Sequence, residues 1–318
     1  MKVVIGATLL GEGFIDRLAG LFPEVTFVAA YSSDAQRREI GDADVFLGWP
    51  DQESVKRARS LRWIHAPGMG IDRLALIPEI ADSTIVLTNS PGSHTNPMAD
   101  HVMAVILALA HNLSALIDDR RARRWDTAKY AERMVELNGA VMGILSIGGI
   151  GRAVAQRAAA FGMRICAVDP GPTDVPAGII DVWGLDRLDE VLGLSDWFVV
   201  TSPLTPETRG IIDARRIGLM KPGASLIVVS RGGIVDEAAL AAALQSGRLA
   251  GAALDATAVE PPPPESPLWG LENVILSPHA SALSPQLYEG RRRVFIGNLR
   301  RFLEGKPLAF VCDLRRGY

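Results

Sequence analysis

The protein has 318 residues, of which 48% are hydrophobic and 22% charged, as in an ordinary globular protein long enough for two domains. Its formal net charge of −3 provides no strong basic field, so neither a nucleic acid nor an anionic membrane is expected as a partner. No segment approaches the ~20 uninterrupted apolar residues that a bilayer-spanning helix needs. The N-terminal residues resemble a short strand rather than a targeting signal, and we expect a cytoplasmic protein.

The first ninety residues alternate short apolar runs with helical segments. Strands are predicted at residues 2–7, 25–30, 44–48, 62–66 and 85–89. Helical patterns separate them, for example at residues 13–22 and 52–60. This alternation predicts a parallel sheet covered by helices.

A turn-rich segment at residues 89–97 is followed by a long apolar stretch that predicts one helix over residues 97–117. The next segment, residues 118–130, is rich in arginine. It is either a solvated helix face or a contact between subunits, and the sequence favours neither.

A second alternating series begins at residue 140. Its strands are predicted at residues 140–148, 163–169, 196–202, 225–230, 251–256 and 273–277. The last segment, residues 284–306, reads as one helix that could lie back on the first domain. The sequence therefore predicts two α/β units with a cleft between them.

Three polar residues stand at or shortly after the ends of predicted strands in the last third of the chain: Arg231, Glu260 and His279. Ligands of open α/β sheets bind beyond the carboxyl ends of the strands. A fixed cation, a carboxylate and a titratable imidazole can polarise a carbonyl group and move a proton. The three residues therefore indicate a catalytic site.

A glycine-rich turn connects the strand at residues 140–148 to a helix, with the sequence Ser146–Ile147–Gly148–Gly149–Ile150–Gly151. Gly148 and Gly151 match the second and third glycines of the dinucleotide-binding pattern, while Ser146 takes the place of the first. The helix N-terminus that follows can bind a pyrophosphate. The competing interpretation is a glycine turn used only for packing.

Asp169 lies at the end of the next strand, where a carboxylate accepts hydrogen bonds from the adenosine ribose. The same carboxylate repels a 2′-phosphate, and no arginine follows it immediately. The sequence therefore favours NAD (NADH) over NADP as cofactor.

Other candidate residues have simpler interpretations. Cys166 lies in an apolar run and reads as a core residue. Asp236 is expected to cap the helix that follows it rather than to take part in catalysis. His65 adjoins a glycine-containing loop, whereas His101 and His111 lie on the long helix. No His, Cys, Asp or Glu cluster has the spacing of metal ligands, so no metal is expected.

With these residues in view, the chain resembles the D-isomer-specific 2-hydroxyacid dehydrogenases over almost its whole length. The resemblance is strongest between residues 137 and 282. The segments that carry it, in the family's order, are residues 137–163, 202–212, 220–256, 260–269 and 273–281. Weaker matches are HAPGMGID at residues 65–72, residues 88–101 and the stretch that ends at Trp125.

The resemblance implies an α/β fold of two Rossmann-like domains. A smaller flavodoxin-like substrate domain would comprise residues 1–96, completed by 283–318, and a doubly wound parallel-sheet NAD-binding domain would comprise residues 97–282. The substrate would lie in the cleft between them. The resemblance also implies a homodimer built on the cofactor domains, with residues 97–117 and the segment around Trp125 near the two-fold axis.

Residue roles follow from the same resemblance. Arg231 would bind the carboxylate and keto oxygen of a 2-oxo acid. His279 would be the general acid in reduction and the base in oxidation, with Glu260 holding its tautomer and favouring the protonated ring. Asp255 would face the nicotinamide carboxamide. The cofactor contacts implied are Gly148, Gly149, Ile150, Gly151, Asp169, Pro203, Thr208, Ser230, Arg231, Asp255 and His279.

On the substrate side, the loop Gly68–Met69–Gly70 would bind the substrate carboxylate through backbone N–H groups. Met69 and Trp49 are candidates for contacts with the substrate side chain. The chain departs from the family pattern at Ser146, at His94 where many members have asparagine, and at Asp100 where many have glutamate. The sequence of the substrate loop also differs, which leaves the substrate's side chain open.

These features predict an NAD-dependent enzyme that interconverts a 2-oxo acid, of the glyoxylate or hydroxypyruvate type or related, and a D-2-hydroxy acid. One alternative is an NAD-sensing scaffold of the corepressor type, because a fold alone does not prove catalysis. Another is a phosphite-type dehydrogenase of the same fold. Glu260 weighs against formate as the reductant, because formate dehydrogenases of this fold carry glutamine there.

Overall fold

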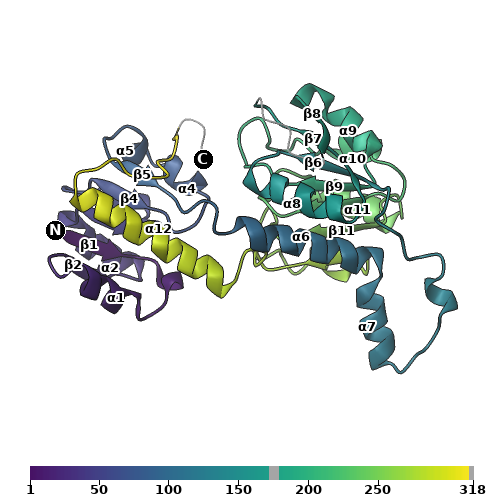
Figure 1. Ribbon diagram of the computed structural model, residues 1–318, viewed down its shortest axis with the longest axis horizontal. Coiled ribbons are helices and arrows are strands. Elements are labelled where there is room, and N and C mark those ends of the chain that lie inside the picture. The colour runs from purple at the N-terminus through teal and green to yellow at the C-terminus, as the bar shows by residue number, and fades with distance from the viewer. Residues whose placement is uncertain (172–178, 315–318) are drawn as a thin grey trace. The chain divides into compact units, whose positions relative to one another are not determined.

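The computed structural model describes residues 1–171 and 179–314 and divides into two compact units. Unit 1 comprises Met1–His94 and Leu283–Tyr318, and unit 2 comprises Thr95–Ala282 (Figure 1). Each unit contains one parallel sheet with helices packed on it, so the predicted α/β class is confirmed.

The sheet of unit 1 has the order β2-β1-β3-β4-β5, and every pair is parallel. This is the flavodoxin-like doubly wound order that the resemblance implied. Its strands are β1 (Lys2–Ile5), β2 (Thr26–Ala29), β3 (Val45–Leu47), β4 (Trp63–His65) and β5 (Val86–Thr88). Its helices are α1 (Phe14–Leu21), α2 (Ser33–Glu39), α3 (Gln52–Val55), α4 (Asp72–Ala75), α5 (Pro78–Ala81) and α12 (Pro285–Leu303).

Helix α12 returns the C-terminal part of the chain to unit 1, as predicted. Ser284 caps it by accepting a hydrogen bond from the Leu287 amide at 3.0 Å. Phe295 and Leu299 are fully buried in the core that α1 and β1 also line. The ring of Phe295 stacks on that of Trp63 at 5.4 Å, so this helix closes one face of the sheet.

A buried polar chain runs through the carboxyl end of β4. The Trp63 indole donates to Thr88 Oγ1 at 2.8 Å, and His65 contacts the same oxygen at 2.7 Å and Ser90 Oγ at 3.0 Å. His65 is fully buried, and this burial lowers its pKa to about 3. The imidazole is therefore neutral in the folded protein at neutral pH.

This burial predicts a pH dependence of stability. The unfolded chain binds a proton on His65 near pH 6.5, whereas the folded protein does so only near pH 3. Stability is therefore lost as the pH falls from 6.5 towards 3, by about 1.4 kcal/mol per pH unit from this group. Urea unfolding at pH 7, 6, 5 and 4 should show a shallower slope for His65→Gln than for the wild type. Parallel slopes for the two proteins would show that His65 does not contribute.

The sheet of unit 2 has seven parallel strands in the order β12-β11-β10-β9-β6-β7-β8. The chain starts at β6, winds outward to β8, and then crosses to β9, which is the doubly wound topology of dinucleotide-binding folds. Its strands are β6 (Val141–Leu145), β7 (Arg164–Val168), β8 (Ile179–Trp183), β9 (Trp197–Val200), β10 (Ser225–Val228), β11 (Gly251–Leu254) and β12 (Val274–Leu276). Its helices are α6 (Thr95–Ala110), α7 (Leu113–Arg121), α8 (Gly149–Ala160), α9 (Leu188–Leu194), α10 (Ala214–Leu219) and α11 (Glu237–Gln245).

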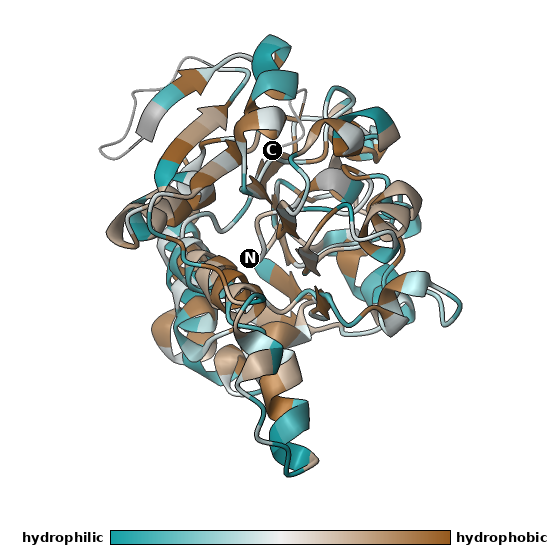
Figure 2. Ribbon diagram, turned by 90° about the vertical axis from the view of Figure 1, so that its right-hand side faces the viewer, coloured by the Kyte–Doolittle hydropathy of each residue, from teal (hydrophilic) through white to brown (hydrophobic). Residues whose placement is uncertain are grey.

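The prediction of one helix over residues 97–117 is wrong. The helix breaks between α6 and α7, whose axes differ by 62°. Asn112 lies at the break in the left-handed conformation (φ +50°), which ends an α-helix and which asparagine tolerates. Its side chain donates to the Arg133 carbonyl at 2.8 Å and fixes the turn. Figure 2 shows the charged last turn of α7 in the hydrophilic colour.

Within the part of the chain that the structure describes, no single helix is long and apolar enough to cross a membrane. The bent pair α6 and α7 passes that test together by length and composition. Met98, Val102 and Ile106 of α6 are, however, buried in the core of unit 2. This pattern is that of a core helix of an α/β domain.

Candidate active site

The turn between β6 and α8 has the geometry of a phosphate-binding loop. A Cβ atom at Gly151 would lie 2.3 Å from the Ser146 carbonyl oxygen, so only glycine fits there. Gly148, the N-cap of α8, has open space where its side chain would be. The α8 N-terminus thus offers unpaired amides and a partial positive charge next to room for an anion.

Ser146 stands in the left-handed region with φ +74°, which explains why glycine is usual at this position. Its hydroxyl donates to Asp169 Oδ2 at 3.1 Å, and the Ile147 amide donates to the same oxygen at 2.8 Å. The Gly171 amide donates to Asp169 Oδ1 at 2.9 Å. The hydrogen bond from Ser146 offsets the backbone strain and fixes the acidic side chain expected at the ribose.

Two substitutions separate these effects. Ser146→Ala keeps the unfavourable φ and loses the hydrogen bond, so it should lower the free energy of unfolding by about 1 kcal/mol. Ser146→Gly loses the same bond but removes the strain, and it should lie closer to the wild type. Urea titrations of the three proteins test this, and an alanine variant at least as stable as the glycine variant would contradict it.

Buried polar groups with unused hydrogen-bonding capacity lie beyond β9 and β10. The hydroxyls of Ser202 and Ser230 are buried and have no hydrogen-bond partner among residues 1–171 and 179–314. Buried hydroxyls of this kind require a partner, and a bound dinucleotide provides several. Thr208 donates to the Pro203 carbonyl at 2.7 Å and so shapes the turn after β9. Together with the glycine turn, these residues fit a nicotinamide dinucleotide.

The structure brings His279 and Glu260 together. His279 Nδ1 lies 3.0 Å from both carboxylate oxygens of Glu260, and Glu260 Oε1 also accepts from the Thr257 amide at 3.2 Å. Because Nδ1 is hydrogen-bonded to Glu260, Nε2 is the ring nitrogen available to a substrate. The side chains of His279 and Glu260 are 47% and 41% exposed, so a ligand can reach them. His279 has φ +52°, a strained conformation often found at functional sites.

Asp255 fixes the loop that carries His279. Its carboxylate is 2% exposed and accepts hydrogen bonds from Ser277 Oγ at 2.6 Å and the Ala280 amide at 2.8 Å. The Ser281 amide donates to both carboxylate oxygens at 3.1 and 3.0 Å. This carboxylate therefore sets the position of His279, and its expected contact with the nicotinamide stays a prediction.

Arg231 lies just beyond β10, and its Nη1 atom donates to the Ser230 carbonyl at 2.7 Å. The next residue, Gly232, packs directly on the loop before Glu260, since a Cβ there would lie 2.0 Å from the Thr257 carbonyl group. The loops of Arg231 and Glu260 are thus in contact within unit 2.

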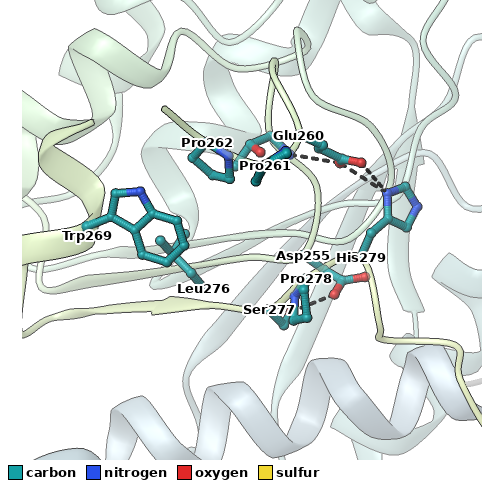
Figure 3. Close-up of a pocket in the computed structure, with 10 residues that line it drawn as sticks. Asp255, Glu260, Pro261, Pro262, Trp269, Leu276, Ser277, Pro278 and His279 are labelled. Carbon is teal, nitrogen blue, oxygen red and sulfur yellow. Dashed lines mark hydrogen bonds and ion pairs between the residues drawn. The ribbon is translucent and has the colours of Figure 1, made fainter. Parts of the chain in front are cut away.

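A pocket of about 490 Å³ opens beside the His279–Glu260 pair. Figure 3 shows the pair on one side of the pocket and the indole of Trp269 on the other. The lining residues are Asp255, Thr257, Glu260, Pro261, Pro262, Trp269, Leu276, Ser277, Pro278 and His279. Trp269 and Leu276 were not predicted as site residues, because aromatic and aliphatic side chains carry no chemical signature. No group of three or more potential metal ligands occurs in the described ranges.

The candidate substrate loop lies in unit 1, after β4. The Gly68 carbonyl accepts from the Ser90 amide and the Met69 carbonyl from the Asn89 side chain, each at 2.9 Å. Amides of Met69 and Gly70 donate to no partner in the described part of the chain. Trp49 packs on Gly68, where a Cβ would lie 3.0 Å from its ring. The loop is therefore held through its carbonyls while its N–H groups stay available.

Two residues that depart from the family pattern, Asp100 and His94, lie in different units. Asp100, on α6, forms an ion pair with Arg157 at 2.7 Å and thereby joins α6 to α8. His94 is buried at the end of the first segment of unit 1. The expected N-cap is confirmed, since Asp236 accepts a hydrogen bond from the Ala239 amide at 3.0 Å.

Residues 103–281 match the family model of the D-isomer specific 2-hydroxyacid dehydrogenase NAD-binding domain. The chain is 36% identical to the D-3-phosphoglycerate dehydrogenase of Archaeoglobus fulgidus over 318 residues, which cover 99% of this chain and 59% of that protein. It is 32% identical to the hydroxypyruvate reductase of Thermotoga maritima, with 88% of this chain and 85% of that protein covered. The chain spans only 54% to 59% of the length of the first three phosphoglycerate dehydrogenases that it matches.

Solved structures give the same relationship. A D-isomer specific 2-hydroxyacid dehydrogenase of Xanthobacter autotrophicus, in complex with NADPH and MES, is 30% identical with a TM-score of 0.84, covering 100% of this chain and 99% of that one. The NADPH-dependent glyoxylate/hydroxypyruvate reductase of Sinorhizobium meliloti, in complex with NADP and sulfate, is 27% identical with a TM-score of 0.86 and the same coverage.

Proposed function

The chain belongs to the D-isomer-specific 2-hydroxyacid dehydrogenase family, and on that premise we propose that it interconverts a 2-oxo acid and a D-2-hydroxy acid. The observation that carries the proposal is the His279–Glu260 pair, held in the same unit as the glycine turn and Arg231. An imidazole oriented by a carboxylate is suited to general acid–base work, and a nearby guanidinium is suited to a carboxylate-bearing carbonyl substrate.

In the proposed reaction, a nicotinamide dinucleotide held by the glycine turn Gly148–Gly151 would supply hydride chemistry at substrate C2. Arg231 binds the substrate carboxylate and keto oxygen and stabilises the negative charge that develops on that oxygen. Protonated His279 gives its Nε2 proton to the oxygen during reduction, and neutral His279 removes it during oxidation. Glu260 orients the ring through Nδ1 and stabilises its protonated form.

We propose that the cofactor is NADH rather than NADPH. The glycine turn Gly148–Gly151 and the α8 N-terminus would hold the pyrophosphate, and Ser202, Pro203, Thr208, Ser230 and Asp255 would surround the nicotinamide half. The fixed carboxylate of Asp169 would accept hydrogen bonds from the ribose hydroxyls and repel a 2′-phosphate. Two of the similar solved structures carry NADPH or NADP, so both cofactors belong in the test.

The proposed substrate is a small 2-oxo acid such as glyoxylate or hydroxypyruvate. The relatives from Thermotoga maritima and Sinorhizobium meliloti are a hydroxypyruvate reductase and a glyoxylate/hydroxypyruvate reductase, which supports this class. In unit 1, the amides of Met69 and Gly70 would donate hydrogen bonds to the substrate carboxylate. The exposed Met69 and Trp49 side chains are the proposed contacts of the substrate side chain.

A specificity profile tests this function. NADH and NADPH oxidation would be followed with glyoxylate, hydroxypyruvate, pyruvate and bulkier 2-oxo acids. We expect turnover with a small 2-oxo acid and a kcat/KM at least tenfold higher with NADH than with NADPH. Binding of NADH without turnover of any substrate would favour an NAD-sensing scaffold, and NADH formation from phosphite would favour phosphite oxidation.

We further propose a homodimer built on unit 2, with α7 and residues 122–136 as the contact arm. Asp119 ties this arm together through hydrogen bonds from Arg124, Lys129 and the Tyr130 hydroxyl, which hold the pKa of its carboxyl well below the usual range. Despite this internal order, the arm exposes apolar side chains. They are Leu113, Ile117, Trp125, Met134 and Val135. Such a patch is typical of a subunit contact.

Trp125, which is 97% exposed, provides the test of the dimer. Trp125→Lys should shift sedimentation at micromolar concentration from dimer towards monomer, because a charge would replace a large apolar contact. Leu76→Lys is the matched control, since Leu76 is 82% exposed but lies in unit 1, outside the arm. A wild-type protein that sediments as a monomer would contradict the proposal.

A further inference from the structure

Glu237 is an acidic residue with no role in the function proposed above. Its side chain contacts the loop that carries the proposed active-site carboxylate, Glu260. Glu237 is the first residue of α11, directly after the capping residue Asp236. Its side chain is half-buried, and Oε1 accepts a short hydrogen bond from the Ala258 amide, 21 residues further along the chain. Glu237 therefore contacts a second loop, in addition to placing a negative charge at the N-terminus of α11.

The loop that Glu237 holds connects two parts of the active site. Thr257 and Ala258 pack directly on Gly232, since a Cβ there would lie 2.0 Å from the Thr257 carbonyl carbon and 2.3 Å from the Ala258 nitrogen. The Thr257 amide donates to Glu260, and Glu260 in turn contacts His279. A shift of this loop would therefore move both the residue after Arg231 and the carboxylate that orients His279.

Glu237 also acts through its charge. Burial raises the pKa of Glu237, and the negative charge of Glu260 raises it further. A negative charge at Glu237 is therefore close enough to Glu260 to interact with it electrostatically. Charged and titratable groups on the neighbouring segments include Arg209, Arg231, Asp236, Asp255, Glu260 and His279.

We propose that Glu237 is a positioning residue for the Glu260–His279 pair. Its carboxylate holds the 257–260 loop in place and provides a second negative charge behind Glu260, which stabilises protonated His279. This inference deepens the proposed function and rests on it for the kinetic part.

Two variants separate the two contributions. Glu237→Gln keeps the side-chain length and the acceptor for Ala258 but removes the charge. It should lower the apparent pKa of His279, so the alkaline limb of the reduction profile moves to lower pH. Glu237→Asp keeps the charge but shortens the reach to Ala258. It should leave the profile near that of the wild type and lower kcat about tenfold.

Asp236→Asn is the matched control, because it removes an adjacent exposed charge and preserves a capping oxygen. Glu260→Gln serves as a reference, because it should lower the pKa of His279 more than Glu237→Gln does. The titration of His279 would be followed by NMR on histidine-labelled protein without substrate, with the signal assigned from His279→Gln. Because this readout needs no turnover, it tests Glu237 even if no 2-oxo acid is reduced, in which case only the proposed function fails.

A lower His279 pKa in Glu237→Gln, with no shift in Asp236→Asn, would support the inference. The inference would be overturned if His279 titrated in Glu237→Gln as it does in the wild type. It would also be overturned if the pKa of His279 shifted equally in Glu237→Gln and Asp236→Asn. Full wild-type kcat in Glu237→Asp would overturn the positioning part.

Discussion

Replacement of His279 by alanine should lower kcat/KM for 2-oxo acid reduction about 1,000-fold. The variant loses the proton donor to the carbonyl oxygen, and general acid–base catalysis contributes factors of about 10² to 10⁴. NADH binding should change less than threefold, because the glycine turn and Asp169 are untouched. Stopped-flow kinetics and NADH fluorescence titration would measure the two quantities.

The control for this substitution is His111→Ala, which removes an exposed histidine from the same unit just after α6. It should retain wild-type kinetics. A His279→Ala variant with more than one tenth of wild-type kcat/KM would rule out His279 as the general acid.

Arg231→Lys should lower kcat/KM at least 100-fold and raise KM for the 2-oxo acid. Lysine keeps the positive charge but cannot make the paired, planar hydrogen bonds that a guanidinium offers to a carboxylate and keto oxygen. Stabilisation of an oxygen that becomes negative in the transition state is worth several kcal/mol, so the loss should appear in kcat as well. Steady-state kinetics over a range of 2-oxo acid concentrations measures both effects.

Arg215→Lys is a suitable control, since Arg215 pairs with Asp189 on the surface of unit 2. Kinetics of Arg231→Lys within threefold of the wild type would mean that Arg231 does not bind the reacting carbonyl.

Much of the fold was predictable because the strands of a parallel sheet are buried on both faces. The strands β6, β9 and β10 are fully buried and read in the sequence as continuous apolar runs. Strand β8 was missed because it is an edge strand with an exposed Asp181 and follows a turn-rich segment. The break at Asn112 was missed because asparagine is compatible with a helix, and its left-handed conformation depends on a distant contact with Arg133.

The reacting groups of the site were predictable from their motifs, whereas the contacts that position them were not. The pairing of Asp255 with the 277–281 loop and of Glu237 with Ala258 joins residues more than 20 positions apart. No local pattern specifies such contacts, because they arise only when the strands of the sheet align their carboxyl ends. Ser146 is an intermediate case, since its substitution for glycine was visible but its bond to Asp169 was not.

We propose that this chain catalyses hydride transfer from NADH to C2 of a 2-oxo acid to give the D-hydroxy acid. Reduction of hydroxypyruvate by NADH, followed by chiral chromatography of the product, tests it most directly. We expect one D-glycerate per NADH consumed, and a rate about 1,000-fold lower for His279→Ala in the same assay. Formation of L-glycerate, or no turnover of any 2-oxo acid by protein that binds NADH, would contradict it.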